Sequence, residues 1–354
     1  MRNSIRAAVF VAFLVCLAFD QVSAQYKEDM NNDGKVEVRD VRYLLILAKV
    51  NPANPRLDYN QDGKYNIVDP VALLISIRDS VLTPIETPGT DTTLIKEIEL
   101  SSLPGGTFEM GCDTGEVDEF PAHTVELDPF EISRTEITNY QYAAYLNAAL
   151  ADGKIEVSSD SIIGASGLYI GKEYLQMAVI DESYNRCWIS FEDNVFVVQW
   201  DKNEWPVVNV TWYGAYAFAA YYGLSLPTEA EWEYACRGGR QNVYGTGDGT
   251  IDYYKANYDL SIGLPLPVAN YPPNSFGLFE MSGNVSEWVN DWYSSYYYSE
   301  SPSSNPPGPE TGVFRVARGG SFNGCEYNSR SAKRVYHEPE YLHSYVGFRV
   351  VRHQ

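Results

Sequence analysis

Residues 206–239 read PVVNVTWYGAYAFAAYYGLSLPTEAEWEYACRGG, and this stretch indicates how the larger part of the chain folds. Thr211 is placed to cap a helix that ends at Gly223, because a threonine side chain accepts a hydrogen bond from the first helical turn. Thr228 is placed to cap a second helix, and Glu231 three residues later completes a capping box. The stretch therefore predicts two short helices separated by a turn.

The segments on either side predict one further helix and several strands. Thr138 is expected to cap a helix that ends at Gly153. Strands are predicted at 105–111 and 123–133, and a hairpin at 187–200 with its turn near Asp193 and Asn194. Much of the remaining sequence is dense in glycine, aromatic residues and turn signals. We therefore expect a loop-rich α+β domain that metal, disulfides or aromatic packing must hold together.

Six stretches of this region resemble the sulfatase-modifying factor family, whose best-known member is the formylglycine-generating enzyme. They are GGTFEMG (105–111), EFPAHTVELDPFEISRTEITNYQYAAYL (119–146), the stretch quoted above (206–239), YPPNSFGLFEMSGNVSEWVNDW (271–292), RGGSF (318–322) and SYVGFRV (344–350). The match covers most of residues 98–354 and implies a compact, C-type-lectin-like fold. Residues 153–205 have no counterpart in the resemblance and are interpreted as an insertion.

The resemblance implies a chemistry that depends on the segment after RGGSF. In the family's enzymes two cysteines follow this segment, bind copper(I) and activate oxygen to convert a substrate cysteine to formylglycine. Copper(I) favours two soft thiolates. Here the sequence continues NGCEYNSRSAKR, so Cys325 is the one thiol of the segment, and Ser321 matches an active-site serine. Cys325 and Ser321 are the candidate catalytic residues.

One thiolate does not build a two-sulfur copper site, so we expect this domain to act as a ligand-binding or accessory module. A copper-dependent oxidoreductase that modifies sulfatases is the alternative. Loops around residues 286–334 are expected to present the ligand surface, since polar and aromatic side chains on a rigid scaffold suit a glycan or a peptide. The surface is predicted to consist of Asn323, Glu326, Tyr327, Arg330 and Arg334.

Two further metal chemistries follow from the resemblance. The family motif in FEMSGNVSEW binds calcium, which here implies the ligands Glu280, Gly283, Val285 and Glu287. Other members of the family bind iron through a histidine cluster. No two of the four histidines of this chain lie at helical i, i+3 or i+4 spacing, so an iron site is not expected.

Four cysteines follow the N-terminal segment, namely Cys112, Cys187, Cys236 and Cys325. They allow three disulfide pairings, and the sequence does not choose among them. A bridge between Cys112 and Cys325 and a set of small buried thiols both stay open.

The first 24 residues are predicted to be a signal peptide. Arg2 and Arg6 precede the apolar run AAVFVAFLVCLAF at 7–19, and small residues at 22–24 offer a cleavage site. We therefore expect a secreted or surface protein, with the periplasm as a further location, whose cysteines meet an oxidising compartment.

Residues 25–80 contain a repeated loop followed by an apolar helical pattern. DMNNDGKVEVRD and DYNQDGKYNIVD both fit a 12-residue EF-hand-like calcium loop, with glycine at the sixth position. The predicted ligands of two calcium ions are Asp29, Asn31, Asp33, Lys35 (backbone), Glu37 and Asp40 in the first loop, and Asp58, Asn60, Asp62, Lys64 (backbone), Asn66 and Asp69 in the second.

Duplicated loop–helix units with Asp at the last position resemble the dockerin module. This resemblance implies a small all-α, calcium-dependent module that docks to a cohesin-like domain of a scaffold protein, in an assembly for polysaccharide catabolism. A calcium-stapled spacer without a cohesin partner is the alternative. Residues 81–97 are rich in Pro and Thr and are interpreted as a linker to the domain at 98–354.

The chain carries 47 acidic and 26 basic side chains, a formal charge of −21. Such a charge repels phosphate backbones, so nucleic acid is not an expected partner. After residue 20 no apolar run approaches the length of a membrane span, so none is predicted.

Overall fold

The computed structural model describes residues 98–177 and 187–353. The chain divides into two units, Met1–Ile85 and Glu86–Gln354, and the described residues belong to the second. The predicted signal peptide, calcium loops, dockerin-like module and linker lie outside the described residues. They stay predictions.

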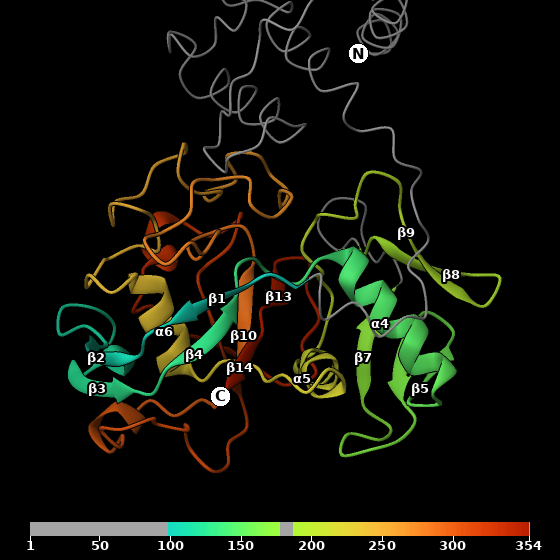
Figure 1. Ribbon diagram of the computed structural model, residues 1–354, viewed down its shortest axis with the longest axis horizontal. Coiled ribbons are helices and arrows are strands. Elements are labelled where there is room, and N and C mark those ends of the chain that lie inside the picture. Colours follow the sequence, from blue (N-terminus) through green and yellow to red (C-terminus); the bar gives the residue numbers. More distant parts are fainter. Residues whose placement is uncertain (1–97, 178–186, 354) are drawn as a thin grey trace, which may run out of the picture. The chain divides into compact units, whose positions relative to one another are not determined.

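Two sheets form the centre of the domain (Figure 1). The first is antiparallel, with β4 (Phe130–Ser133) between β1 (Leu100–Leu103) and β14 (Val351–His353). Phe130 and Ile132 are buried on one face of β4, as the alternation of side chains along a strand requires.

The second sheet contains parts of three of the stretches that carry the family resemblance. Its order is β12 (Val335–His337), β11 (Arg315–Arg318), β10 (Ser286–Trp292) and β13 (Val346–Phe348). β10 pairs with β13 in parallel, and the other pairs are antiparallel. β10 is buried along most of its length, because helices and loops cover both faces of this sheet.

All three predicted helices are present with the caps that the sequence indicated. They are α4 (Asn139–Ala151), α5 (Trp212–Tyr221) and α6 (Glu229–Arg237). Thr138 and Thr228 each form a complete capping box, and Thr211 accepts a hydrogen bond from Gly214 N. Gly238 ends α6 in the left-handed conformation, with φ of 61°.

Short elements complete the frame. β2 (Gly106–Met110) lies in the strand predicted at 105–111 and pairs with β3 (His123–Leu127). The strand predicted at 123–133 is divided at Asp128 and Pro129 into β3 and β4, which belong to different sheets. The one-turn 3₁₀ helices are η4 (Val117–Glu119), η5 (Tyr297–Ser299) and η6 (Glu326–Ser329). The described part is thus mostly β and loop-rich with few helices, which confirms the loop-rich part of the predicted α+β class.

The insertion has a structure of its own. It forms a three-stranded sheet of β5 (Ile155–Ser158), β6 (Ser161–Gly164) and β7 (Glu173–Gln176), followed by a hairpin of β8 (Ile189–Glu192) and β9 (Val195–Val198). The hairpin turns at Asp193 and Asn194, whose φ angles are 50° and 65°, so the predicted turn is confirmed. These strands lie with α4 on one side of the domain, and α6 lies with β2 and β3 on the other (Figure 1).

Two large apolar clusters and a third, smaller one hold the described domain together. Of the two large clusters, one surrounds α4 and α5 and includes Trp212, Phe218 and Trp288, while the other surrounds α6 and includes Trp232. α5 is buried on most sides, since Tyr, Phe and Trp rings of neighbouring elements pack against it. Across residues 98–177 and 187–353, no helix has the length and hydropathy of a membrane span.

His337 lies in a stack of aromatic rings beside β12. Its ring is parallel to that of Tyr341, with centroids 4.1 Å apart, and packs edge-on against Trp288. Its Nε2 atom is buried with no partner among the described residues. Burial, reinforced by His343, lowers the pKa of His337 from 6.5 to about 4.

This depressed pKa predicts acid sensitivity. The contribution of the neutral His337 ring to stability is present above pH 6.5 and is lost as the pH falls towards 4. We expect His337→Gln to flatten that part of the stability curve, measured by thermal unfolding at several pH values. His353→Gln is the control with opposite sign, because Glu231 raises the pKa of His353. A wild-type and a His337→Gln curve of equal slope between pH 6.5 and 4 would contradict this.

Candidate functional site

The chain reaches Cys325 through two glycines at which a side chain would be strained. Gly319 and Gly320 follow β11 with φ angles of 92° and 69°. A Cβ on Gly319 would lie 3.1 Å from the Trp232 ring, and one on Gly320 would lie 2.7 Å from Asn328 O. The RGGSF motif is therefore a tight backbone turn packed against α6 and η6.

Backbone hydrogen bonds fix the segment before Cys325. Asp259 N donates to Gly324 O and Leu260 N donates to Phe322 O, each at 2.7 Å. Phe322 N donates to Asn284 O at 2.9 Å. The loop that contains Asp259 thus lies alongside the RGGSF turn, and both are attached to the SGNVSEW motif.

Cys325 is exposed and precedes η6, and it is not in a disulfide. Ser321, the other candidate catalytic residue, is 6% exposed, and its hydroxyl donates to Asn323 Oδ1 at 2.7 Å. The two residues belong to one loop, with Ser321 buried and Cys325 at the surface.

Tyrosines that the sequence reasoning missed surround this loop. Tyr244 donates its hydroxyl hydrogen to Glu326 Oε1 at 3.0 Å, and Tyr253 donates to Asp259 Oδ2 at 3.1 Å. The rings of Tyr253 and Tyr258 stack with centroids 4.8 Å apart. Burial and nearby carboxylates raise the pKa of Tyr244 and of Tyr258 to about 12, so both hydroxyls are protonated near neutral pH. The tyrosine-rich run YYKANYDL at 253–260 was the feature of the sequence that could have indicated Tyr253 and Tyr258.

We call this region the Cys325 face and define it as Cys325, Glu326, Tyr327, Tyr244, Tyr253 and Asp259. Tyr258 is buried and packs against the Tyr253 ring. Tyr327 is 43% exposed and Glu326 is exposed, as the predicted ligand surface requires. The face offers aromatic rings, hydroxyl donors and carboxylate acceptors.

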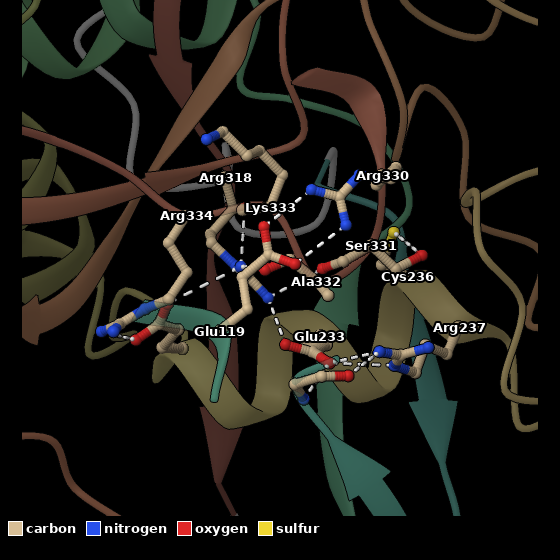
Figure 2. A network of polar contacts seen from close by, with 12 residues as sticks. Glu119, Glu233, Cys236, Arg237, Arg318, Arg330, Ser331, Ala332, Lys333 and Arg334 are labelled. Atoms are coloured by element: carbon tan, nitrogen blue, oxygen red, sulfur yellow. Dashed lines mark hydrogen bonds and ion pairs between the residues drawn. The ribbon is translucent and has the colours of Figure 1, made fainter. Parts of the chain in front are cut away.

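Arg330 and Arg334, the other members of the predicted ligand surface, are turned towards carboxylates (Figure 2). Arg330 forms two hydrogen bonds to Glu119, of 2.7 and 2.8 Å. Arg334 is 2% exposed and forms two to Glu229, of 2.7 and 2.9 Å. Arg334 is therefore not at the surface, and the predicted surface is reduced to Asn323, Glu326 and Tyr327 with a partly accessible Arg330.

The same ion-pair network continues beneath the face. Arg318 and Arg237 both bind the fully buried Glu233, Arg237 at 2.7 Å (Figure 2). Burial raises the pKa of Glu233, but the two guanidinium groups outweigh this effect and hold the pKa below its ordinary value. Arg318 also donates to Ala332 O, Lys333 O and Ser331 O, which fixes the backbone after η6 to α6. The face is thus carried by a rigid support.

The other cysteines do not form the disulfides that the sequence left open. Cys112, Cys187, Cys236 and Cys325 are all free. Cys236 is fully buried, with its sulfur 3.3 Å from Met281 O and 3.2 Å from Ser331 Oγ. Burial raises the pKa of Cys236 and of Cys187 to about 12, so both are inert thiols. Cys112 is half-buried and contacts the Thr114 hydroxyl at 3.4 Å.

The carboxylates of the predicted calcium site already have partners. Glu280 accepts hydrogen bonds from the backbone N–H groups of residues 269–271, at 2.8 to 3.1 Å. Glu287 accepts from Arg349 at 2.6 and 2.8 Å and from Trp232 Nε1 at 2.6 Å. Gly283 and Val285 lie between them. A cation at Glu280 and Glu287 would have to displace or share these donors, so their carboxylates fit a calcium ion poorly.

Two oxygen atoms beside this motif are better placed for a cation. Glu136 Oε2 and Asn257 Oδ1 are buried and have no partner among the described residues. Both residues contact the side chain of Asn284, at 3.0 and 3.4 Å. No group of three or more His, Cys, Asp or Glu side chains in residues 98–177 and 187–353 is arranged to hold a metal ion. A cation here would depend on amide and carbonyl oxygens as well.

The chain is similar in sequence and in fold to known proteins. Residues 86–354 match the family model described as a sulfatase-modifying factor enzyme 1-like domain. A protein of Streptomyces coelicolor named formylglycine-generating enzyme is 35% identical over 70% of this chain and 87% of its own length. A Chlamydia caviae protein named serine/threonine-protein kinase pkn1 is 35% identical over 72% of this chain, which spans only 38% of that relative. The solved structure of PvdO from Pseudomonas aeruginosa is similar with a TM-score of 0.54 and 27% identity, over 72% of this chain and 94% of PvdO.

Proposed function

The chain belongs to the sulfatase-modifying factor family, and from that premise we propose that its domain binds a ligand at the Cys325 face as an accessory module. The proposal rests on the number of cysteine thiols at the loop and on their accessibility. Cys325 is the exposed thiol of the loop, and Cys112 is half-buried with its sulfur beside the Thr114 hydroxyl. Cys187 and Cys236 are buried with pKa values of about 12. A copper(I) site that activates oxygen, as implied by the family resemblance, requires two thiolate ligands.

The Cys325 face has the composition of a binding surface. Exposed Tyr327 offers a ring for stacking, while Tyr244 and Tyr253 hold Glu326 and Asp259 in position by hydrogen bonds. Aromatic rings beside carboxylates and hydroxyls suit the apolar face and the hydroxyl groups of a sugar, or a peptide. Since Arg318, Arg330 and Arg334 anchor the loop from below, little ordering is required on binding.

The proposal is tested by affinity electrophoresis of the full chain in gels that contain soluble polysaccharides. We expect retardation in at least one polysaccharide, weakened several-fold by Tyr327→Ala and retained in Tyr327→Phe. Loss of one stacked ring costs about 0.5–1.5 kcal/mol, which is a factor of about 2 to 12. Retardation that is absent from every gel, or unchanged in Tyr327→Ala, would contradict binding of a glycan at this face.

A second candidate function is favoured by the names of the relatives. Proteins called formylglycine-generating enzymes are similar to this chain over most of their own length. In this alternative Cys325 would hold copper(I), which would supply oxygen activation, and Ser321 would lie beside it. Incubation with copper and a CxPxR-type peptide tests it, because conversion of the peptide cysteine to formylglycine is visible by mass spectrometry. We expect no conversion, and turnover that is abolished by Cys325→Ser would replace the accessory module with the enzyme.

The N-terminal part of the proposal is the dockerin-like module. The two repeated calcium loops support a calcium-folded unit in a secreted protein that docks to a cohesin-like domain of a polysaccharide-degrading assembly. We expect cohesin domains to retain the full chain with calcium and to release it with a chelator. Retention that does not respond to the chelator, or no retention by any cohesin, would support the spacer alternative instead.

A further inference from the structure

The described domain buries five arginine side chains to below one-tenth exposure, namely Arg237, Arg315, Arg318, Arg334 and Arg349. Four of the five form an ion pair with a carboxylate at 2.7 Å or closer. Arg315, at 8% exposure, is the exception, since no carboxylate of the described residues lies within ion-pair distance of it. A buried cation without a counter-ion is costly, so its surroundings require an explanation.

Arg315 lies between two tryptophan rings. Its guanidinium carbon is 3.6 Å from the centroid of Trp212 and 3.4 Å from that of Trp292. Nη1 donates to Asn290 O at 2.5 Å. Nε is buried without a partner, and Nη2 has no acceptor among the residues that the structure describes. The rings satisfy the faces of the guanidinium group but leave part of its hydrogen-bonding edge open.

Asp291 acts electrostatically on Arg315 but forms no ion pair with it, and its carboxyl group has a partner elsewhere. Asp291 accepts a hydrogen bond from Glu229 N at 2.7 Å, and burial together with Glu229 raises its pKa well above the ordinary value. No carboxylate of the described residues forms an ion pair with Arg315, so its positive charge can bind an anionic group that comes from outside them.

Half-buried aromatic rings of the insertion and of α5 adjoin this stack. Tyr169 packs edge-on against Trp212 at 5.6 Å and against Tyr216 at 5.2 Å. Tyr169, Tyr216 and Trp292 are each partly accessible. Tyr169 lies between β6 and β7, in the part of the chain for which the resemblance offered no counterpart. Aromatic rings beside a cation suit a sugar ring that bears an acidic substituent.

We propose that Arg315 anchors a second ligand site, which takes an oxyanion group, carboxylate or sulfate, carried on a sugar ring. The oxyanion meets the open edge of the guanidinium group, and the sugar ring packs against the half-buried aromatic side chains around it. The site is separate from the Cys325 face, because Arg315 begins β11 and Cys325 follows the turn beyond its other end. It therefore stands whether or not the Cys325 face binds a ligand.

Isothermal titration calorimetry of the full chain with three matched sugars tests the site. The probes are glucuronate, glucose 6-sulfate and glucose at constant ionic strength. We expect at least one anionic sugar to bind tenfold or more tightly than glucose, and to change tryptophan fluorescence because Trp212 and Trp292 flank the guanidinium group that the anion meets. The two anionic probes distinguish a carboxylate ligand from a sulfate ligand. Equal affinities for all three sugars, or no binding of any, would overturn the proposal.

Variants separate a binding role from a structural one. Arg315→Gln is expected to weaken anionic-sugar binding at least tenfold, while Arg352→Gln, which breaks an exposed pair with Glu131 at 2.6 Å, leaves it unchanged. If Arg315→Gln does not fold, Tyr169→Ala at the edge of the stack replaces it and is expected to weaken binding several-fold. If the affinity is unchanged in the variant that folds, the role of Arg315 is structural and consists of packing between the rings of Trp212 and Trp292.

Discussion

Replacing Arg318 by methionine is expected to lower the free energy of unfolding of the domain by about 3–5 kcal/mol. The side chain is fully buried, and its loss leaves Glu233 with Arg237 alone as ionic partner. It also leaves the carbonyl groups of residues 331–333 without their donor. Urea unfolding followed by tryptophan fluorescence measures the effect. All 7 tryptophans lie between residues 188 and 292, so the signal reports on this domain alone.

Arg352→Met is the matched control for Arg318→Met. Arg352 also forms a short contact to a carboxylate, Glu131 at 2.6 Å, but at an exposed position. Exposed pairs contribute about 0–1 kcal/mol because solvent screens them. Similar losses in the two variants would mean that the network beneath the Cys325 face does not hold its loops in place.

Glu287→Gln is expected to have an effect of the same size, about 3–5 kcal/mol, for a related reason. Arg349 then stays buried without its counter-ion. Its hydrogen bonds to Ser133 O and Phe279 O remain, but they do not neutralise its positive charge. Because Arg349 connects β4, the segment before the SGNVSEW motif and β10, the loss should be seen as a lower midpoint of the whole transition.

Calcium provides the control for Glu287→Gln. If Arg349 is the partner of Glu287, the variant loses stability equally with calcium and with a chelator. If Glu287 instead ligates calcium, the wild-type protein loses stability in the chelator and the variant shows little further change. Glu136→Gln tests the other cation position, beside Asn257, and should abolish any calcium-dependent shift that arises there.

Local signals in the sequence predicted the helices and the hairpin correctly. Thr138, Thr211 and Thr228 cap the three α-helices, and Asp193 with Asn194 forms the hairpin turn. These features depend on residues within one or two turns of one another, so their physical cause is contained in a short stretch.

The candidate site was predicted less completely because its contacts are long-range. Arg330 and Arg334 looked like surface residues, yet their partners Glu119 and Glu229 lie 211 and 105 residues away. Nothing within the RSAKR segment indicates that its guanidinium groups point inward. Tyr253 and Tyr258 were missed for the same reason, since the loop at 253–260 reaches Cys325 only through backbone pairing with residues 322–324.

The arrangement of Arg315 also lies beyond sequence reasoning. Trp212 and Trp292 come from α5 and the end of β10, and only the folded sheet brings them to opposite faces of one guanidinium group. The absence of a counter-ion is visible only by comparison with the other buried arginines of the described domain.

Binding of copper(I) to the reduced full chain distinguishes an accessory module from a copper enzyme. The measurement is titration against a competing chelator, followed by X-ray absorption at the copper edge to count sulfur ligands. We expect no site that binds one equivalent of copper(I) through two sulfur ligands, either in the wild-type protein or in Cys325→Ser and Cys112→Ser. One tightly bound copper(I) with two sulfur ligands, lost in Cys325→Ser, would contradict the account and make the domain a copper enzyme.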